Sequence, residues 1–404
     1  MIDGDVEGPP GSSVEEAVEA VLRHGSRSPN GRGRGASLHR RPVCEAETTL
    51  STGRYAEERG STGEPSRGMT MAGEIYGVPI EDAWRRVGSR EQLVSIESST
   101  RADGPDAGTR RIRMVNADLE VDVLPDRGLD IGQVRVAGVP LAWVSPTGFR
   151  PGTVSDPSGW MRAFGGGLLT TCGLLSYGAP SEDEGERHPL HGTYSSLQAR
   201  VVRTDVVDGE LVVEGLVREV RVFGEHLELR RRISSPIGSR AIRIDDRLVN
   251  AGSRAVEPMV LYHVNLGWPL VDEGTELRTP GGLVEARDEA AERGLQSWSR
   301  FPASARAFPE QVFRHELPPS TPTAIEVVAA RGLAVRIAFD TSVLPALFQW
   351  RVAEENGHVV LGVEPATAPT ILGRADARAR GMLRPLAPGA ELSLGLGLEV
   401  VVPR

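Results

Sequence analysis

Leucine stands at every second position of the segment Glu391-Leu-Ser-Leu-Gly-Leu-Gly-Leu-Glu399. Successive side chains of a β-strand point to opposite faces, so this period of two predicts a strand with one buried face. Ile242 and Ile244 alternate with charged residues in the same way. The period of two dominates from about residue 108 onward, which predicts a protein built mainly from strands.

Helical patterns are scarce in this sequence. The best ones, residues 81–87 and 288–298, are both short. Strands that follow one another without long connecting helices favour antiparallel sheets, because a parallel pair needs a long crossover. We therefore expect an all-β fold, and about 300 residues of strand pattern favour one large sandwich over a barrel. The sequence shows no repeat of roughly 20 to 50 residues, which argues against a propeller or a solenoid.

Composition excludes several classes of function. The chain has 404 residues, of which 39% are hydrophobic and 25% are charged, as in an ordinary globular protein. None of its 46 basic residues is a lysine, which excludes Schiff-base aldolases, pyridoxal enzymes and Walker-type phosphate loops. The net charge of −9 argues against nucleic-acid binding, and no glycine-rich loop has the setting of a dinucleotide-binding loop.

The composition also suggests a location. No stretch approaches the roughly 18 apolar residues that span a bilayer. The N-terminus is acidic where a secretory signal would be basic. Two cysteines, Cys44 and Cys172, are too few for a disulfide framework. We therefore expect a cytoplasmic protein without membrane contact, whose oligomeric state stays open, with a homodimer as one option.

Residues 1–70 differ from the rest of the chain. They are rich in glycine, serine, arginine and proline and lack the alternating apolar pattern. A segment of this composition buries too little apolar surface to fold alone. We predict a disordered extension over residues 1–70 and a single domain over residues 71–404.

Three segments hold side chains that could carry acid/base chemistry, and they are centred on His191, on His263 and on Glu364. His263 and Asn265 are two residues apart and so share one face of a strand. Glu364 ends an apolar strand, where burial should raise the pKa of its carboxyl. The alternatives are a histidine and an amide satisfied inside the core, and a carboxylate that is turned to solvent or paired with Arg374.

These segments resemble the motifs of a known superfamily. Leu190-His191-Gly192, Tyr262-His263-Val264-Asn265 and Gly362-Val363-Glu364-Pro365 come in the order and approximate spacing found in the aldose 1-epimerase, or galactose mutarotase-like, superfamily. The chain more closely resembles a poorly characterised branch of it, named mainly as a domain of unknown function. This likeness is carried by residues 124–132, 159–167, 171–174, 348–350 and 364–367, and it covers about residues 73–402.

The resemblance implies a fold and a reaction. The fold is an antiparallel β-supersandwich with few short helices, and the isomerase reaction interconverts the α and β anomers of an aldose without a cofactor. Glu364 would take the proton of the anomeric hydroxyl, His263 would protonate the ring oxygen, and His191 would bind hydroxyls or stabilise charge. The candidates for binding this small-molecule sugar are Asp126, Arg127, Arg162, Tyr262, Asn265, Gln349, Trp350 and Arg374.

The chain departs from the better-known mutarotases at Val264, where an aromatic residue is usual, and at Thr193, where a glycine is usual. These differences concern the substrate more than the fold. One alternative function is a metal-dependent sugar isomerase or lyase. Its divalent metal would be held by His188, His191, His263 and Glu364. The other alternative is a carbohydrate-binding protein without catalysis, since a fold does not fix a function.

Overall fold

The computed structural model describes residues 73–151, 159–319 and 322–402. All of these residues belong to one compact unit. The extension predicted over residues 1–70 lies outside the described residues, so it stays a prediction. Within the described part, no helix is long and apolar enough to cross a membrane.

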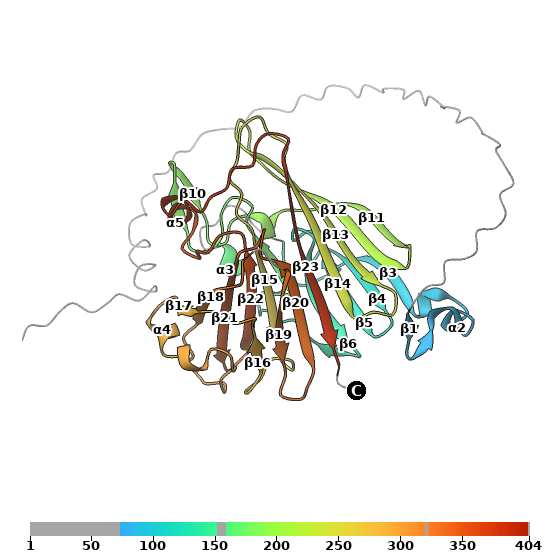
Figure 1. Ribbon diagram of the computed structural model, residues 1–404. Coiled ribbons are helices and arrows are strands. Elements are labelled where there is room, and N and C mark those ends of the chain that lie inside the picture. Colours follow the sequence, from blue (N-terminus) through green and yellow to red (C-terminus); the bar gives the residue numbers. More distant parts are fainter. Residues whose placement is uncertain (1–72, 152–158, 320–321, 403–404) are drawn as a thin grey trace, which may run out of the picture. The chain divides into compact units, whose positions relative to one another are not determined.

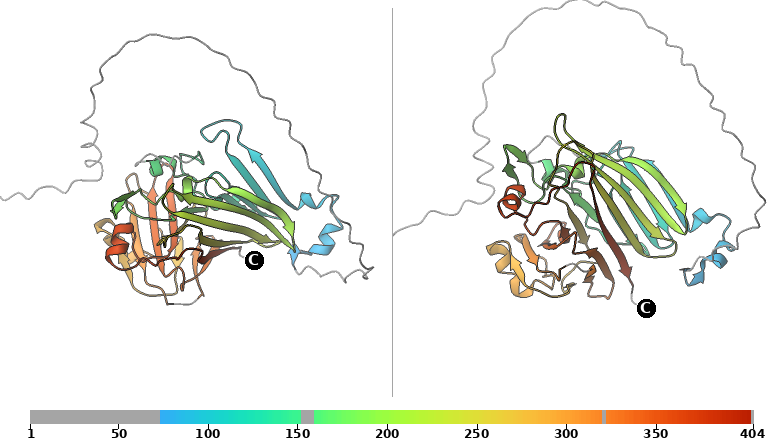
Figure 2. Two further views of the ribbon diagram at one scale, coloured as in Figure 1. Left: turned by 90° about the horizontal axis from the view of Figure 1, so that it is seen from above. Right: turned by 45° about the horizontal axis from the view of Figure 1, so that its top comes forward.

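Two large sheets make up most of this unit (Figures 1 and 2). The smaller has eight strands, which in spatial order are β11 (Arg200–Val207), β12 (Glu210–Val220), β13 (His226–Pro236), β14 (Ala241–Asn250), β23 (Glu391–Val401), β20 (Ala334–Asp340), β19 (Pro322–Val328) and β16 (Glu276–Arg278). The larger has eleven, in the order β17 (Val284–Ala286), β18 (Gln311–His315), β21 (Ala346–Glu354), β22 (His358–Ala366), β15 (Leu261–Gly267), β8 (Leu169–Cys172), β6 (Asp130–Val136), β5 (Leu119–Leu124), β4 (Arg110–Asn116) and β3 (Val94–Thr100), with β7 (Val139–Pro140) paired to β6.

All pairs of named strands in the two sheets are antiparallel, which confirms the predicted all-β sandwich. Two antiparallel ribbons complete the described strands. They are formed by β1 (Glu74–Ile75) with β2 (Val78–Pro79), and by β9 (Ser181–Asp183) with β10 (Glu186–His188).

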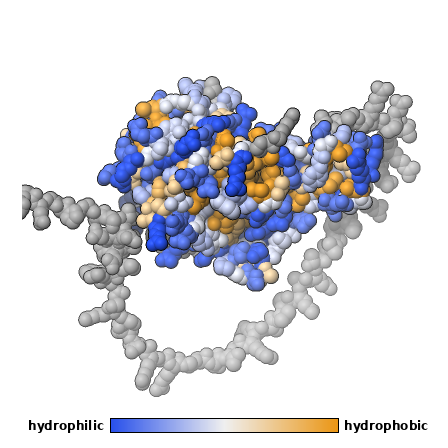
Figure 3. Space-filling model, turned by 90° about the horizontal axis from the view of Figure 1, so that it is seen from below, coloured by the Kyte–Doolittle hydropathy of each residue, from blue (hydrophilic) through white to orange (hydrophobic). Residues whose placement is uncertain are grey.

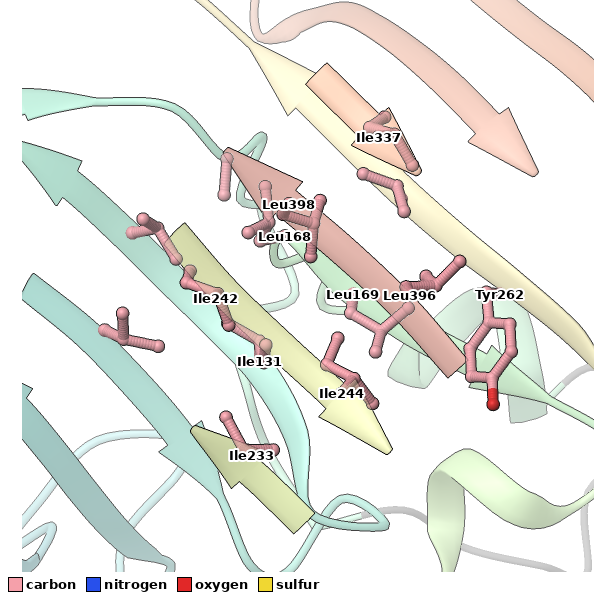
Figure 4. Close-up of a cluster of buried hydrophobic side chains, with 14 of the residues drawn as sticks. Ile131, Leu168, Leu169, Ile233, Ile242, Ile244, Tyr262, Ile337, Leu396 and Leu398 are labelled. Carbon is pink, nitrogen blue, oxygen red and sulfur yellow. The ribbon is translucent and has the colours of Figure 1, made fainter. Parts of the chain in front are cut away.

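The leucine-rich segment forms β23, in the middle of the smaller sheet. Its Leu396 and Leu398 pair with Ile244 and Ile242 of β14 (Figure 4). All four are buried in one cluster with side chains of the larger sheet such as Ile131. The burial of these alternate residues confirms the predicted period of two.

A charged cluster also lies between the sheets. Arg231 of the smaller sheet is 1% exposed. It donates hydrogen bonds to both oxygens of Asp246, at 2.8 and 2.6 Å, and to Asp130 of the larger sheet at 2.6 Å. Thr171 donates to Asp130 and Tyr262 donates to Asp246, each at 2.7 Å. Charge-assisted hydrogen bonds therefore join the two sheets inside the core.

The helices of the described part are short. They are α2 (Ile80–Trp84), α3 (Gly159–Ala163), α4 (Glu289–Glu292) and α5 (Arg374–Ala379), with 3₁₀ turns η1 (Arg90–Gln92), η2 (Tyr194–Ser196) and η3 (Leu295–Ser297). The helix predicted over residues 81–87 corresponds to α2, and the one predicted over residues 288–298 is divided into α4 and η3. Gly294 separates these two, at a position where Gln311 and Arg351 side chains lie 2.4 Å from where a Cβ would stand.

Apolar side chains remain at the surface in patches that hydrophilic side chains separate (Figure 3). Large exposed examples are Tyr76, Met161, Phe223 and Trp268. Scattered apolar side chains are common on folded proteins and do not by themselves indicate a binding surface.

Candidate functional site

The face of the larger sheet that points away from the interior carries the candidate site. Asn265 of β15 pairs with Gly362 of β22, and Trp350 of β21 pairs with the same glycine. Paired residues of antiparallel strands point to the same face, and so do residues two apart along one strand. His263 and Glu364 therefore share a face with Asn265 and Trp350, whereas the intervening residues of these strands point into the core.

The three catalytic candidates meet on this face. The His263 Nε2 and Glu364 Oε1 atoms are 3.3 Å apart, at ion-pair distance but without the alignment of a hydrogen bond. The ring centroids of His191 and His263 are 5.7 Å apart, and the rings meet edge to face. His263 is 4% exposed and Glu364 is 2% exposed, so both are shielded from bulk water.

A tight turn brings His191 to the sheet. His191 has a left-handed backbone with a φ of 56°, and Gly192 follows with a φ of 73°. A Cβ on Gly192 would lie 2.3 Å from the carbonyl oxygen of Ser176. Glu219 of the smaller sheet steadies the turn by accepting a hydrogen bond from the Thr193 hydroxyl. Glycine is required after His191 for close backbone packing.

Aromatic rings cover the catalytic candidates. Trp160 of α3 stacks on Phe164, with ring centroids 4.3 Å apart, and on His191, with centroids 4.4 Å apart. Trp350 meets His263 edge to face at 5.4 Å. An apolar cover excludes water, which strengthens the electrostatic interactions beneath it.

Polar atoms without partners concentrate in this site. Among the described residues, eleven buried side-chain nitrogen or oxygen atoms have no hydrogen-bond partner. Five of them lie in the cluster around His263: Trp160 Nε1, His191 Nδ1, His263 Nδ1, Asn265 Oδ1 and Glu364 Oε1. An unsatisfied buried polar group costs about 1–3 kcal/mol. Their concentration in one place indicates a site built to hydrogen-bond a polar ligand.

Burial drives the pKa values of the central pair in opposite directions. It raises the pKa of Glu364 to about 8, where Glu310 adds to the effect and Arg287 opposes it. It lowers the pKa of His263 to about 3, where His191 adds to the effect and Asn265 opposes it. Burial alone lowers the pKa of His191 to about 4. At neutral pH the pair of His263 and Glu364 therefore holds one proton, carried by Glu364.

Asn265 lies beside His263 and orients its surroundings. Its Nδ2 donates to the carbonyl oxygens of Gly167 and His263, each at 3.0 Å. It is close enough to raise the pKa of the His263 ring, although Asn265 Oδ1 and His263 Nδ1 do not reach hydrogen-bond geometry. A proton on Nδ1 directed at Asn265 would leave the Nε2 lone pair facing Glu364.

Tyr262 and Gln349, predicted to bind the sugar, lie on the opposite face of the larger sheet. Each is one residue away from a residue of the site, and alternation turns its side chain into the core. Tyr262 is engaged with the charged cluster between the sheets. Gln349 donates to the Trp298 carbonyl at 2.8 Å and contacts His315 Nε2 at 3.0 Å. The structure therefore does not bring either residue to His263.

Asp126 and Arg374, also predicted to bind the sugar, are held in ion pairs elsewhere. Asp126 pairs with Arg110 and accepts three of its hydrogen bonds, at 2.5 to 2.9 Å. Arg374 of α5 pairs with Asp183 at 2.9 Å and with Glu257 at 3.1 Å. The alternative in which Arg374 neutralises Glu364 is therefore wrong.

Arg127 lies in the loop between β5 and β6, and Arg162 lies on α3 with Trp160. Arg127 is 5% exposed, and it donates to the Arg150 carbonyl oxygen at 3.1 Å. Arg162 is exposed on α3, two residues after Trp160. No contact within the described residues joins either guanidinium to His263 or Glu364, so their role in sugar binding stays a prediction.

The alternative metal site is not assembled. His188 ends β10. Burial lowers its pKa, and the charges that also act on that pKa belong to Arg374, Glu186, Asp183 and Glu225. Within residues 73–151, 159–319 and 322–402, no group of three or more histidine, cysteine or acidic side chains is arranged to hold a metal ion. The four residues proposed as metal ligands are therefore not arranged to hold a metal ion.

Two charged residues near Glu364 escaped the sequence analysis. Arg287 precedes α4 and Glu310 precedes β18, and their side chains form an ion pair at 2.8 Å. They come from loops beside the edge strand β17 and its neighbour β18, and no motif or spacing marks them. Only the order of strands in the sheet brings them to the site.

A groove of about 600 Å³ crosses the outer face of the smaller sheet. Its charged lining residues include Arg232, which pairs with Glu210 at 3.0 Å and Glu214 at 3.4 Å. The groove contains none of the buried polar atoms that lack partners. We therefore place the candidate functional site around His263, where buried polar atoms lack partners, and not in this groove.

We expect the protein to lose stability in acid because of its buried histidines. Burial lowers the pKa of His263 to about 3 and that of His315 to about 4, from an ordinary value of 6.5. The unfolded chain binds protons below that value that the folded chain excludes, so the contribution of each of these histidines to the free energy of unfolding falls as the pH drops below about 6.5. Each histidine should remove about 3 kcal/mol by pH 4, which urea unfolding at pH 7 and pH 4 measures.

His315→Gln provides the comparison for this expectation. Glutamine keeps a hydrogen-bonding group toward Gln349 but takes up no proton. The variant should therefore show a difference between the two pH values that is smaller by about 3 kcal/mol. An unchanged difference would mean that His315 is not held neutral by burial.

Solved structures show the class to which this fold belongs. A "putative aldose 1-epimerase" from Klebsiella pneumoniae has a TM-score of 0.68 and 24% identity, over 76% of this chain and 83% of that one. A galactose mutarotase-like protein from Clostridium acetobutylicum has a TM-score of 0.54 and 13% identity, over 77% and 100%. Galactose 1-epimerase from Lactobacillus acidophilus has a TM-score of 0.51 and 14% identity, over 76% and 99%. The fold is therefore the galactose mutarotase-like sandwich.

The family is shown by the sequence. Residues 106–400 match the family model described as domain of unknown function DUF4432, and the chain belongs to this family. No curated protein matches the sequence. The predicted likeness to a domain of unknown function is thus confirmed, and the likeness to mutarotase-like proteins is confirmed at the level of the fold.

Proposed function

We propose that the protein is a carbohydrate isomerase that interconverts the α and β anomers of an aldose by general acid/base catalysis. One observation carries the proposal. A buried pair, His263 and Glu364, shares a single proton at neutral pH, within a cluster of polar atoms that lack protein partners. Opening a sugar ring requires one group that accepts a proton and one that donates it.

The reaction follows from the proton carried by this pair. In a cyclic sugar, the Glu364 carboxylate takes the proton of the anomeric hydroxyl while protonated His263 gives its proton to the ring oxygen. The bond between C1 and the ring oxygen breaks, and C1 becomes the carbon of an aldehyde. After rotation about the C1–C2 bond, the same two groups exchange roles and the ring closes on its other face. The resting pair, with its proton on Glu364, matches the open-chain stage. The distance of 3.3 Å between the two side chains lets the proton pass to His263 when a cyclic sugar binds.

His191 supports this step from the side. Its ring lies next to His263 and beneath Trp160, and burial keeps it neutral. A neutral imidazole both donates and accepts one hydrogen bond, which suits a hydroxyl at the anomeric carbon. The aromatic cover formed by Trp160, Phe164 and Trp350 would contact the apolar face of the sugar ring.

Exchange NMR tests the proposed function. Anomer interconversion is measured for neutral and acidic aldoses with purified protein, and the metal content of the same batch is determined. Faster exchange of one sugar, unaffected by a chelator, supports the mutarotase. Sugar binding without faster exchange would instead identify a carbohydrate-binding protein, and exchange that the chelator removes would identify metal-dependent chemistry.

Gly362→Ala should impair the site while the fold is kept. A Cβ at this position would lie 2.8 Å from Glu364 Oε1, so the carboxyl group must move. A displacement of about 1 Å of a catalytic group can cost about 100-fold in rate, and we expect a loss of that order in exchange NMR. Gly397→Ala is the matched control. Its Cβ would have only Ala338 nearby, at 3.8 Å, and equal losses in both variants would contradict the role given to Glu364.

A further inference from the structure

A group of charged side chains stands beside the proposed reacting pair. The Arg287 guanidinium lies between two carboxylates. Its Nε donates to Asp288 at 2.7 Å and its Nη2 donates to Glu310 at 2.8 Å. The other Glu310 oxygen accepts a hydrogen bond from Trp350 Nε1 at 3.2 Å. We call Arg287, Asp288 and Glu310 the charged wall.

Trp350 links the charged wall to the reacting pair at Gly362. A Cβ on this glycine would lie 2.8 Å from Glu364 Oε1 and 3.0 Å from Trp350 Cβ. Glu364 and Trp350 therefore flank the same glycine, and Trp350 is the ring that Glu310 holds. Within the described residues, Glu310 and Arg287 are the charged side chains that act on the pKa of Glu364.

The charged wall is suited to hydroxyl groups. One guanidinium between two carboxylates leaves one negative charge uncompensated. The side chains of Arg287 and Glu310 are 29% and 53% exposed, so both can reach a ligand. Arg287 Nη1 has no protein partner among the described residues, and each Glu310 oxygen has a lone pair to spare. A sugar hydroxyl can accept from the first and donate to the second.

We propose that Arg287 and Glu310 are specificity-determining residues, which hydrogen-bond hydroxyls of an uncharged sugar beside Glu364 and disfavour a sugar with an acidic group. The inference rests on the proposed function. An acidic substituent near this wall would face the carboxylate of Glu310, and like charges at close range are costly. A neutral sugar meets no such repulsion.

The first test compares sugars that differ in one charge. Exchange NMR gives kcat/KM for D-galactose and D-galacturonate, and for D-glucose and D-glucose 6-phosphate. We expect the wild type to favour the neutral member of each pair by about tenfold or more. Glu310→Gln should reduce that ratio by about tenfold, mainly by improving the acidic sugar. Glu289→Gln, at a side chain 93% exposed and paired with Arg293, is the control and should leave the ratio unchanged.

Two outcomes of this comparison would overturn the inference. One is a wild type that prefers the acidic sugars, and the other is a Glu310→Gln variant with the ratio of the wild type. If no sugar exchanges faster with wild-type protein, the proposed function is wrong. A second measurement then tests whether the charged wall acts on the Glu364 carboxyl.

The second measurement follows the Glu364 carboxyl directly. Carbon-13 NMR of protein labelled in the glutamate carboxyl groups gives its titration, and the signal is assigned by its absence in Glu364→Gln. Removing the charge of Glu310 removes an influence that raises the pKa of Glu364, so the Glu364 carboxyl should titrate at a lower pH in Glu310→Gln than in the wild type. An unchanged titration would show that the charged wall does not act on the reacting pair.

Discussion

Glu364→Gln is expected to lower the rate of anomer exchange by about 100- to 10,000-fold, the range that a positioned general acid or base contributes. Glutamine has nearly the size of glutamate, and its amide can neither release nor take up a proton near neutral pH. His263 would then have no partner 3.3 Å away to complete the exchange. Exchange NMR with the best sugar of the panel measures the loss.

The same substitution should leave the protein folded and more stable above pH 5. The pKa of Glu364 rises from an ordinary value of 4.5 to about 8 on folding. The folded state therefore binds a proton that the unfolded state releases, and the contribution of Glu364 to the free energy of unfolding of the wild type falls as the pH rises from about 4.5 to about 8. Glu364→Gln lacks this pH-dependent loss. Its free energy of unfolding relative to that of the wild type therefore increases from about pH 4.5 to about pH 8 and is constant above that range.

Glu289→Gln is the control for this prediction because it removes an exposed carboxylate. It should change neither the rate nor the dependence of stability on pH. Exchange at the wild-type rate in Glu364→Gln would exclude Glu364 as the base. A variant that loses its rate but gains no stability at alkaline pH would show that Glu364 is ionised in the resting protein.

Arg231→Met is expected to destabilise the fold by about 3–5 kcal/mol, the usual cost of removing one partner of a buried ion pair. The substitution leaves Asp130 and Asp246 in the interior without their counter-charge. Both are below 5% exposed, so water cannot replace the guanidinium. Urea unfolding at pH 7 measures the cost.

Two comparisons separate the loss of charge from the loss of packing. Adding Asp130→Asn and Asp246→Asn removes the unpaired charges, so this triple variant should recover much of the lost stability. Arg203→Met breaks an exposed pair with Asp205 at 3.0 Å and should cost less than about 1 kcal/mol. Equal costs for Arg231→Met and Arg203→Met would mean that the buried cluster does not hold the sheets together.

The buried cluster also lies directly behind the proposed site. Thr171 and Tyr262 bind the cluster, and they neighbour Thr170 and His263 on the other face of the same strands. We expect Arg231→Met to reduce exchange even at temperatures where it stays folded, because the register of β8 and β15 positions His263.

Local sequence was sufficient for the fold class and for three side chains that the structure brings together. The period of two around Leu396 needs no tertiary information, because alternation is a property of the extended backbone. The motifs around His191, His263 and Glu364 were also readable, since each is a run of adjacent residues. The structure brings these three side chains together on one face of the larger sheet.

Other features depended on contacts between distant segments. The alternation of a strand predicts that Tyr262 and His263 point to opposite faces of the sheet, but it does not predict which face is buried in the core. Asp126 and Arg374 have partners 16 and 191 residues away, and no local pattern reveals such pairs. The predicted cytoplasmic location and the oligomeric state stay predictions.

The sequence by itself therefore determined the all-β architecture, the family and the three residues of the proposed acid/base site. Tertiary structure alone decided that Arg287 and Glu310 stand beside Glu364. It also decided that burial raises the pKa of Glu364 and lowers the pKa of His263. The physical reason is the range of the interactions. Backbone alternation acts between neighbouring residues, whereas burial and charge act through space, between strands whose order in the sheet differs from their order in the chain.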